Sequence, residues 1–140
     1  MESERDPLMS HVLLPVAHPE DATTSATALK PFGPDRVTAV HVVEKAGGAP
    51  DKTPVEHSKE VAQESFEAVR RVFPDADEEI RYSADIVEGI IAAARDLDAS
   101  VIAFHPRGGS RLVQLLAGDM SRKLIQHGGY PVLGLPEPDT

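Results

Sequence analysis

Glycines and basic side chains are concentrated in one segment, residues 105–128. The segment contains Gly108, Gly109 and Gly118, and its four basic side chains outnumber its single acid, Asp119, giving a local net charge of +3. Glycines let backbone N–H groups approach a bound anion closely, and positive charge attracts that anion. The simpler alternative is that the basic side chains are solvated or pair with acids on neighbouring helices, while Asp119 only caps a helix. An anion site therefore depends on the elements that position this segment.

Histidines could supply a second kind of chemistry. His18 and His105 each follow a predicted strand, and with Asp119 they would offer the imidazole and carboxylate ligands that bind zinc. The three residues come from separate loops and form no short metal-binding motif. We therefore favour the interpretation that the two imidazoles only fill space. Exposed imidazoles gain charge below a pKa of roughly 6.5, which predicts that any anion binding strengthens at acidic pH. Three further histidines are placed only as surface or strand residues: His57, His127 and His41.

Covalent or acid–base catalysis has little support in the sequence. Ser110 and Ser121 lie near histidines, but neither stands in the G-x-S-x-G turn that exposes a nucleophile. The paired acids at positions 75, 77, 78 and 79 fall on a polar connection and are most simply solvated. The chain has no cysteine, which excludes thiolate nucleophiles, thiolate zinc sites and disulfides. We therefore name no catalytic residue and do not expect an enzyme.

The elements that would position these residues alternate between strand and helix. Helix start signals precede the second and third helices, with Thr53 or Asp85 as the N-cap and a glutamate three residues later. Such alternation, with strands apolar on both faces, predicts a doubly wound five-stranded parallel sheet with helices on both faces, of order 3-2-1-4-5. The predicted strands are 11–16, 36–43, 79–82, 100–104 and 131–136, and the predicted helices are 20–30, 53–73, 85–97 and 119–127.

This topology places the candidate residues at one edge of the sheet. Ligands of doubly wound folds bind outside the carboxyl ends of the strands, where the strand order reverses. That switch point lies between the first and fourth strands, whose ends are the segments 17–19 and 105–108. Proline is tolerated at strand starts and in edge strands, so Pro131 and Pro136 predict that the last strand is an edge strand.

Composition excludes several classes of partner. The chain has 140 residues and a formal net charge of -9, so a general nucleic-acid binder is disfavoured, and aromatic residues make up only 4%, too few for base stacking. The N-terminus does not read as a signal peptide, and the densest apolar run, residues 90–94, is far shorter than the roughly 20 residues that span a bilayer. We expect a cytoplasmic protein that binds neither nucleic acid nor membrane.

Several stretches of the chain resemble the universal stress protein family. They are Val12–Val16, Val40–Val43, the series Gly108…Gly118…Ser121, and Pro131–Leu133. The resemblance covers residues 11–136 and implies the adenine nucleotide alpha-hydrolase-like fold. It divides the chain into a flexible leader (1–10), a universal stress protein-like domain (11–136) and a tail (137–140). In members that bind ATP, the loop after the fourth strand reads G-x-x-G, nine residues, then G-[ST].

The resemblance also shows where this chain departs from the ATP-binding pattern. The first glycine position falls on His105, whose ring would obstruct a nucleotide, and the strand-1 aspartate position falls on Ala17. The Ser/Thr position falls on Asp119, and two like charges about 4 Å apart repel by roughly 4 kcal/mol at an effective dielectric constant near 20. Val42 matches the adenine-side valine. The resemblance therefore implies a vestigial nucleotide site with disfavoured ATP binding and no resident cofactor, made of Ala17, Val42, His105, Gly108, Gly118, Asp119 and Ser121.

The resemblance implies a function without chemistry. Family members commonly dimerise through the last strand, which suits an exposed edge strand at Pro131–Leu135. The preferred hypothesis is stress-linked regulation through dimerisation and contact with a protein partner that the sequence does not name. Two alternatives remain open: a regulatory switch that binds ATP or AMP, and a small hydrolase or metal-dependent enzyme of the related superfamily.

Overall fold

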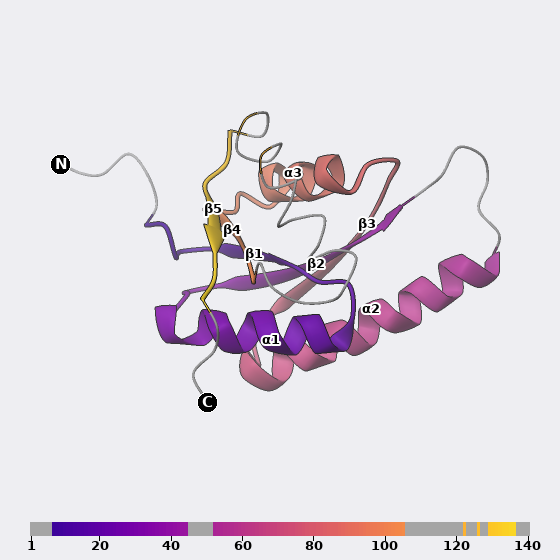
Figure 1. The fold of residues 1–140 in the computed structure, drawn as a ribbon, viewed down its shortest axis with the longest axis horizontal. Helices are drawn as coiled ribbons and strands as arrows, with labels where there is room; N and C mark the ends of the chain where they lie inside the picture. Colours follow the sequence, from indigo (N-terminus) through magenta and orange to yellow (C-terminus); the bar gives the residue numbers. More distant parts are fainter. Residues whose placement is uncertain (1–6, 45–51, 106–121, 123–125, 127–128, 137–140) are drawn as a thin grey trace.

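Five parallel strands form the centre of the molecule. The computed structural model describes residues 7–44, 52–105, 122, 126 and 129–136, and only the backbone of residues 52–56. The strands are β1 (Val12–Pro15), β2 (Val37–Glu44), β3 (Asp77–Ser83), β4 (Val101–Phe104) and β5 (Val132–Gly134). They pair in parallel in the order β3-β2-β1-β4-β5 (Figure 1), which confirms the predicted fold and the edge position of the last strand.

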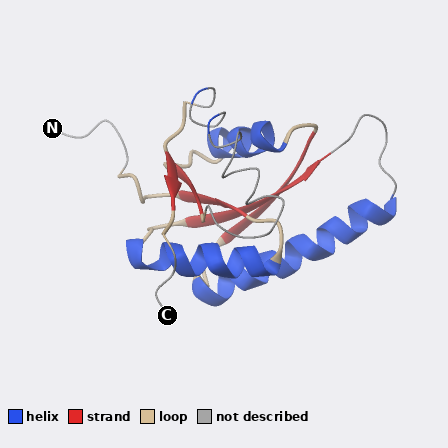
Figure 2. Ribbon diagram, in the orientation of Figure 1, coloured by secondary structure: helices blue, strands red, loops and turns tan. Residues whose placement is uncertain are grey.

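Helices cover both faces of the sheet. Helices α1 (Pro19–Leu29) and α2 (Lys52–Val72) lie on one face, and α3 (Ile86–Asp96) lies on the other (Figure 2). Successive strand residues point to opposite faces, so Leu14 joins the buried cluster with α1 and α2, while Leu13 joins the cluster with α3. Burying each such side chain contributes roughly 1.5–3 kcal/mol to stability. Strands with apolar side chains on both faces therefore stabilise the packing of the helices on each side of the sheet.

Element boundaries differ from the prediction by one to a few residues. Helix α1 begins at Pro19, with His18 as its N-cap, and β3 is three residues longer than the predicted 79–82. Helix α2 begins at Lys52, so Thr53 lies within the helix and is not its N-cap. At α3 the predicted cap is present, because the Asp85 carboxylate accepts a hydrogen bond from the Glu88 N–H at 3.1 Å. Most of the predicted last helix lies outside the described residues.

A short η1 turn, Lys30–Phe32, connects α1 to β2. It ends at Gly33, whose φ of +62° is the left-handed conformation that glycine adopts without strain. The chain can therefore reverse direction within a few residues and enter β2 at Val37.

Polar side chains join the strands at their amino ends. The His11 ring Nε2 lies 2.8 Å from the Thr38 hydroxyl, and the His11 backbone N–H donates to the Ser100 hydroxyl at 2.9 Å. The Ser100 hydroxyl lies 2.6 Å from the Leu8 carbonyl oxygen, and the Asp35 N–H donates to the Met9 carbonyl at 2.9 Å. These bonds hold residues 8 and 9 of the predicted leader against the domain.

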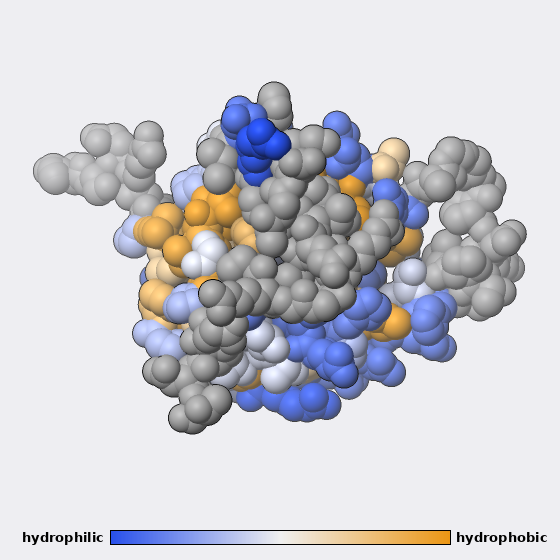
Figure 3. All heavy atoms as spheres, viewed as in Figure 1, coloured by the Kyte–Doolittle hydropathy of each residue, from blue (hydrophilic) through white to orange (hydrophobic). Residues whose placement is uncertain are grey.

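The surface is unevenly polar. Figure 3 shows mostly hydrophilic residues over α1 and α2, whereas apolar atoms reach the surface on the side where β5 lies in Figure 1. Within β5, Val132 and Leu133 are half-buried and Gly134 is exposed. Among the described residues no strand pairs with the outer side of β5, and its apolar side chains are partly exposed.

Candidate ligand pocket

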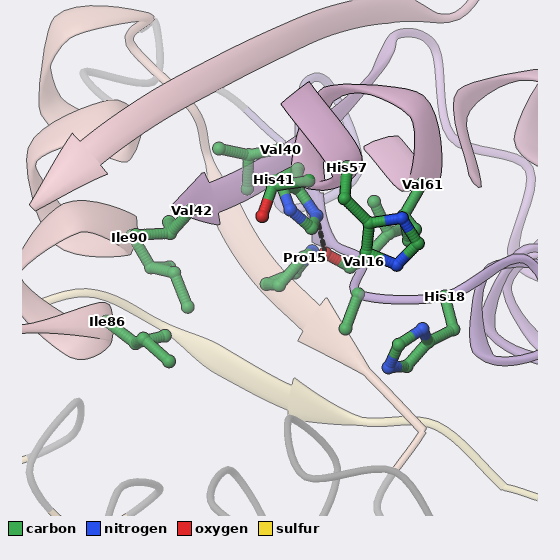
Figure 4. Close-up of a pocket in the computed structure, with 12 residues that line it drawn as sticks. Pro15, Val16, His18, Val40, His41, Val42, His57, Val61, Ile86 and Ile90 are labelled. Carbon is green, nitrogen blue, oxygen red and sulfur yellow. Dashed lines mark hydrogen bonds between the residues drawn. The ribbon is translucent and has the colours of Figure 1, made fainter. Parts of the chain in front are cut away.

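A mainly apolar pocket opens at the carboxyl ends of β1 and β2. Its volume is about 220 Å³, and α2 and α3 close it from opposite sides (Figure 4). The carboxyl edge is where doubly wound sheets bind ligands. Lining side chains come from both strand ends, from the start of α1 and from both helices: Pro15, Val16, Ala17, His18, Val40, His41, Val42, His57, Ser58, Val61, Ile86 and Ile90.

His41 is the most deeply buried imidazole of the pocket. Its Nδ1 lies 3.2 Å from the carbonyl oxygen of Val16, and because a carbonyl only accepts, Nδ1 carries the proton. Burial lowers the pKa of His41 below its usual 6.5, and the nearby His18 lowers it further, although the hydrogen bond to Val16 acts in the opposite direction. The ring is therefore neutral near pH 7, and its polar edge is directed at the backbone.

The polar part of the lining also includes two exposed imidazoles and the hydroxyl group of Ser58. His18 comes from the N-cap of α1, and His57 comes from α2. Figure 4 shows both on one side of the pocket, with Ile86 and Ile90 of α3 on the other. The ionisable groups among the described lining residues are thus all imidazoles, which suits an uncharged ring or a weak anion better than a cation.

The start of α3 determines one wall of the pocket. Its first turn is stabilised by the Asp85 cap. Ile86 and Ile90 are four residues apart, so they lie on the same face of the helix, and both line the pocket. At the other end of α3, Arg81 of β3 bonds Asp96 at 2.7 Å and Glu79 at 2.6 Å. The hydrogen bond to Asp96 is the main cause of the raised pKa of Arg81. The helix is therefore capped at its first turn and joined to β3 by an ion pair at its last residue.

The structure brings together part of the predicted nucleotide site. Ala17 and Val42 both line the pocket. His105 follows β4 and is buried, with 4% of its surface exposed, but it is not among the described residues that line the pocket. Four residues of the predicted site lie outside the described residues: Gly108, Gly118, Asp119 and Ser121.

Several pocket residues were not predicted from the sequence. His41 was identified only as a strand residue, and His57 only as a surface residue. The signals that could have found them are simple: His41 directly precedes Val42 at the end of a strand, and His57 lies four residues before Val61 on the same helix face. Ile86 and Ile90 were assigned to a helical stripe, which is correct, but that stripe also lines the pocket.

The described residues contain no cluster of potential metal ligands. Among the described residues, no three His, Asp or Glu side chains are grouped so that they could hold a metal ion. The predicted combination of His18, His105 and Asp119 includes a residue that the structure does not describe.

The sheet order, with a pocket at the carboxyl edge of the sheet, places the chain in the class of doubly wound α/β proteins. Comparisons narrow that class. The model of the universal stress protein family matches residues 9–136, so the chain belongs to this family, as its sequence resemblance indicated. No curated protein matches the chain by sequence. Within the described residues, no helix is long and apolar enough to cross a membrane.

Solved structures of family members share the fold at low identity. A universal stress protein from Archaeoglobus fulgidus, in complex with dAMP, is 16% identical with a TM-score of 0.67, and the match covers 93% of this chain and all of that one. A family protein from Burkholderia pseudomallei is 20% identical, with a TM-score of 0.65 and coverage of 94% and 98%. An AMP-bound family protein from Arabidopsis thaliana is 12% identical, with a TM-score of 0.59 and coverage of 90% for both chains.

Proposed function

We propose that this chain is a non-enzymatic regulatory domain of the cytoplasm that acts through dimerisation and protein contact in a stress response, with impaired ATP binding. The observation that carries the proposal is the lining of the pocket. Ala17 supplies a methyl group where ATP-binding relatives place a carboxylate, and the rest of the described lining offers imidazoles and one hydroxyl among apolar side chains. The loop that would hold phosphates has Asp119 at its Ser/Thr position.

Restoring the family pattern tests this proposal. The triple variant Ala17→Asp, His105→Gly, Asp119→Ser leaves the net charge unchanged, because one acid is gained and one is lost. We expect Mg²⁺·ATP to raise the melting temperature of the triple variant in a concentration-dependent way, because a ligand stabilises the state that binds it. The unchanged protein should shift little at the same concentrations.

Two controls separate the site from its surroundings. The variant Ala17→Asp with Glu64→Gln has the same net charge but an unaltered phosphate loop, and its melting temperature should not respond to ATP. Because His105 is buried, circular dichroism must first show that the triple variant folds; the double variant Ala17→Asp, Asp119→Ser, which keeps His105, is the milder second test. An unchanged protein that responds to ATP as strongly as the triple variant would contradict impaired binding.

The dimer is proposed through the edge of β5. Pro131 O accepts from Ile102 N–H at 3.0 Å, and Leu135 N–H donates to Phe104 O at 2.8 Å, so these alternate residues bond β4. The backbone groups of Val132 and Gly134 then point away from β4, on the side where no described strand pairs with β5, and would pair with the same strand of a second copy. Gly134→Pro removes one outward N–H and should weaken the dimer in sedimentation measurements, whereas Gly134→Ala keeps the N–H and should not.

A second candidate function is a nucleotide-responsive switch. The pocket favours it, because an apolar volume of about 220 Å³ beside Val42 suits one planar ring system, below the roughly 300–1,000 Å³ of larger ligand sites. Two of the similar structures contain dAMP or AMP. This candidate predicts that adenosine and AMP raise the melting temperature by an amount that grows with ligand concentration. At one hundred times the dissociation constant, the free energy of unfolding should increase by about 2.7 kcal/mol.

A further inference from the structure

Helix α3 contains one glycine in its interior, Gly89, at a position where its propensity alone would be unfavourable. Glycine in a helix interior costs about 1 kcal/mol relative to alanine. Gly89 is not at either end of the helix, so it neither caps α3 nor terminates it. Its φ is not in the left-handed region, so its backbone conformation does not require glycine. The reason for glycine must therefore lie in what the helix packs against.

The close approach of α3 to β2 and β3 supplies that reason. A Cβ added at Gly89 would lie 2.9 Å from Val42 Cγ1, 3.2 Å from Val42 Cγ2 and 3.1 Å from Ser83 Cβ. Carbon atoms in good contact lie about 3.5–4.0 Å apart, so an alanine here forces a displacement. Two of the three contacts are with the same valine. The backbone of α3 thus rests directly on the Val42 side chain.

Val42 is also part of the pocket lining. Its β-branched side chain is stiff at χ1, so it cannot easily rotate away from a clash. An added methyl group at position 89 would either push Val42 toward the pocket or lift α3 away from the sheet. Because Ile86 and Ile90 of α3 line the same pocket, either movement changes the pocket wall.

We propose that Gly89 is a positioning residue for the pocket, which holds Val42, Ile86 and Ile90 in place for an uncharged planar ligand ring. Gly89 does not itself line the pocket. It acts through Val42, whose γ-carbons occupy the space that a Cβ at position 89 would need, and through the distance that it permits between α3 and the sheet. The proposal rests on the second candidate function above, in which this pocket takes a nucleobase.

A double-mutant cycle tests the proposal. The variants are Gly89→Ala, Val42→Ala and the two combined, and the probe is adenosine, titrated by calorimetry. Gly89→Ala should weaken adenosine binding about tenfold or more. Val42→Ala removes the γ-carbons that clash, so the double variant should bind adenosine within about threefold of Val42→Ala alone. Circular dichroism must show that each variant is folded, so that the affinity reports the shape of the pocket and not the folded fraction.

A matched control shows whether the effect of Gly89→Ala comes from a change in helix propensity or from the place of the residue against the sheet. Ala92 lies on the exposed face of the same helix, so Ala92→Gly changes propensity by the same amount in the opposite direction without touching β2. Its adenosine affinity should stay within about twofold of the unchanged protein. Unchanged affinity in Gly89→Ala, or a double variant as weak as the two single effects combined, would overturn the proposal.

Methyl resonances distinguish failure of this inference from failure of the proposed function. If the unchanged protein does not bind adenosine, the nucleotide switch is wrong, but the methyl signals of Ile86 and Ile90 still report the position of α3. These signals should move in Gly89→Ala and return toward their positions in Val42→Ala when both changes are combined. Signals that do not move in Gly89→Ala would overturn the positioning role whether or not adenosine binds.

Discussion

The imidazole of His41 on β2 donates a hydrogen bond to the carbonyl oxygen of Val16, the residue that follows β1, across 3.2 Å. The backbone at the same place adds a second bond, from Val16 N–H to the Val40 carbonyl at 2.9 Å. Val16 is therefore held to β2 through both its backbone N–H and its carbonyl oxygen. Because Ala17 and His18 follow directly, this pair of bonds determines where the chain leaves the sheet at the pocket.

The protein should lose stability as the pH falls below about 6.5. Burial lowers the folded-state pKa of both His41 and His11 from that value, so the unfolded chain takes up protons more readily. The stabilising contribution is complete above pH 6.5 and is lost as the pH falls toward the lowered pKa values, with a slope of at most about 1.4 kcal/mol per pH unit for each histidine. Urea unfolding at a series of pH values measures it.

Replacing His41 should flatten that pH dependence. His41→Asn keeps an N–H donor near the Val16 carbonyl but does not titrate, so its stability curve should be less steep between pH 5 and 7. An unchanged slope in His41→Asn would show that other groups cause the acid sensitivity.

Thr38→Val should destabilise the domain by about 1–3 kcal/mol. The substitution keeps a branched side chain but removes the hydroxyl 2.8 Å from His11 Nε2, leaving a buried ring nitrogen without that partner. Thr38→Ser retains the hydroxyl and should lose less. Equal losses in the two variants, measured by urea unfolding at pH 7.5, would assign the effect to packing and not to the hydrogen bond.

Asp85→Ala should cost about 1 kcal/mol of stability, because it removes the side chain that accepts from the Glu88 N–H. Asp85→Asn retains an acceptor oxygen and should be close to neutral. Thermal unfolding compares the three proteins. A loss in the asparagine variant as large as in the alanine variant would point to the negative charge at the helix N-terminus as the stabilising feature.

The alternation of strands and helices, with right-handed crossovers, predicted the strand order and the layering. Strands β1, β2 and β4 are largely apolar, whereas the edge strand β3 is mostly polar. The segments between the strands have helical spacing, so a parallel sheet covered on both faces is the arrangement that buries the apolar strands. The departures from the ATP-binding pattern at Ala17, His105 and Asp119 were also readable from the residues. What they do to nucleotide binding remains a prediction.

Only the tertiary structure decided which side chains share the pocket. His41 and His57 are 16 positions apart, and no local pattern relates them, because their place in one pocket depends on how α2 lies against the end of β2. Gly89 is the clearest case. In the sequence it weakens a helix, and only the packing of α3 on Val42 shows that a methyl group at that position has no room. Periodicity records which face of an element is buried, but the distance between two packed elements is a property of the folded molecule.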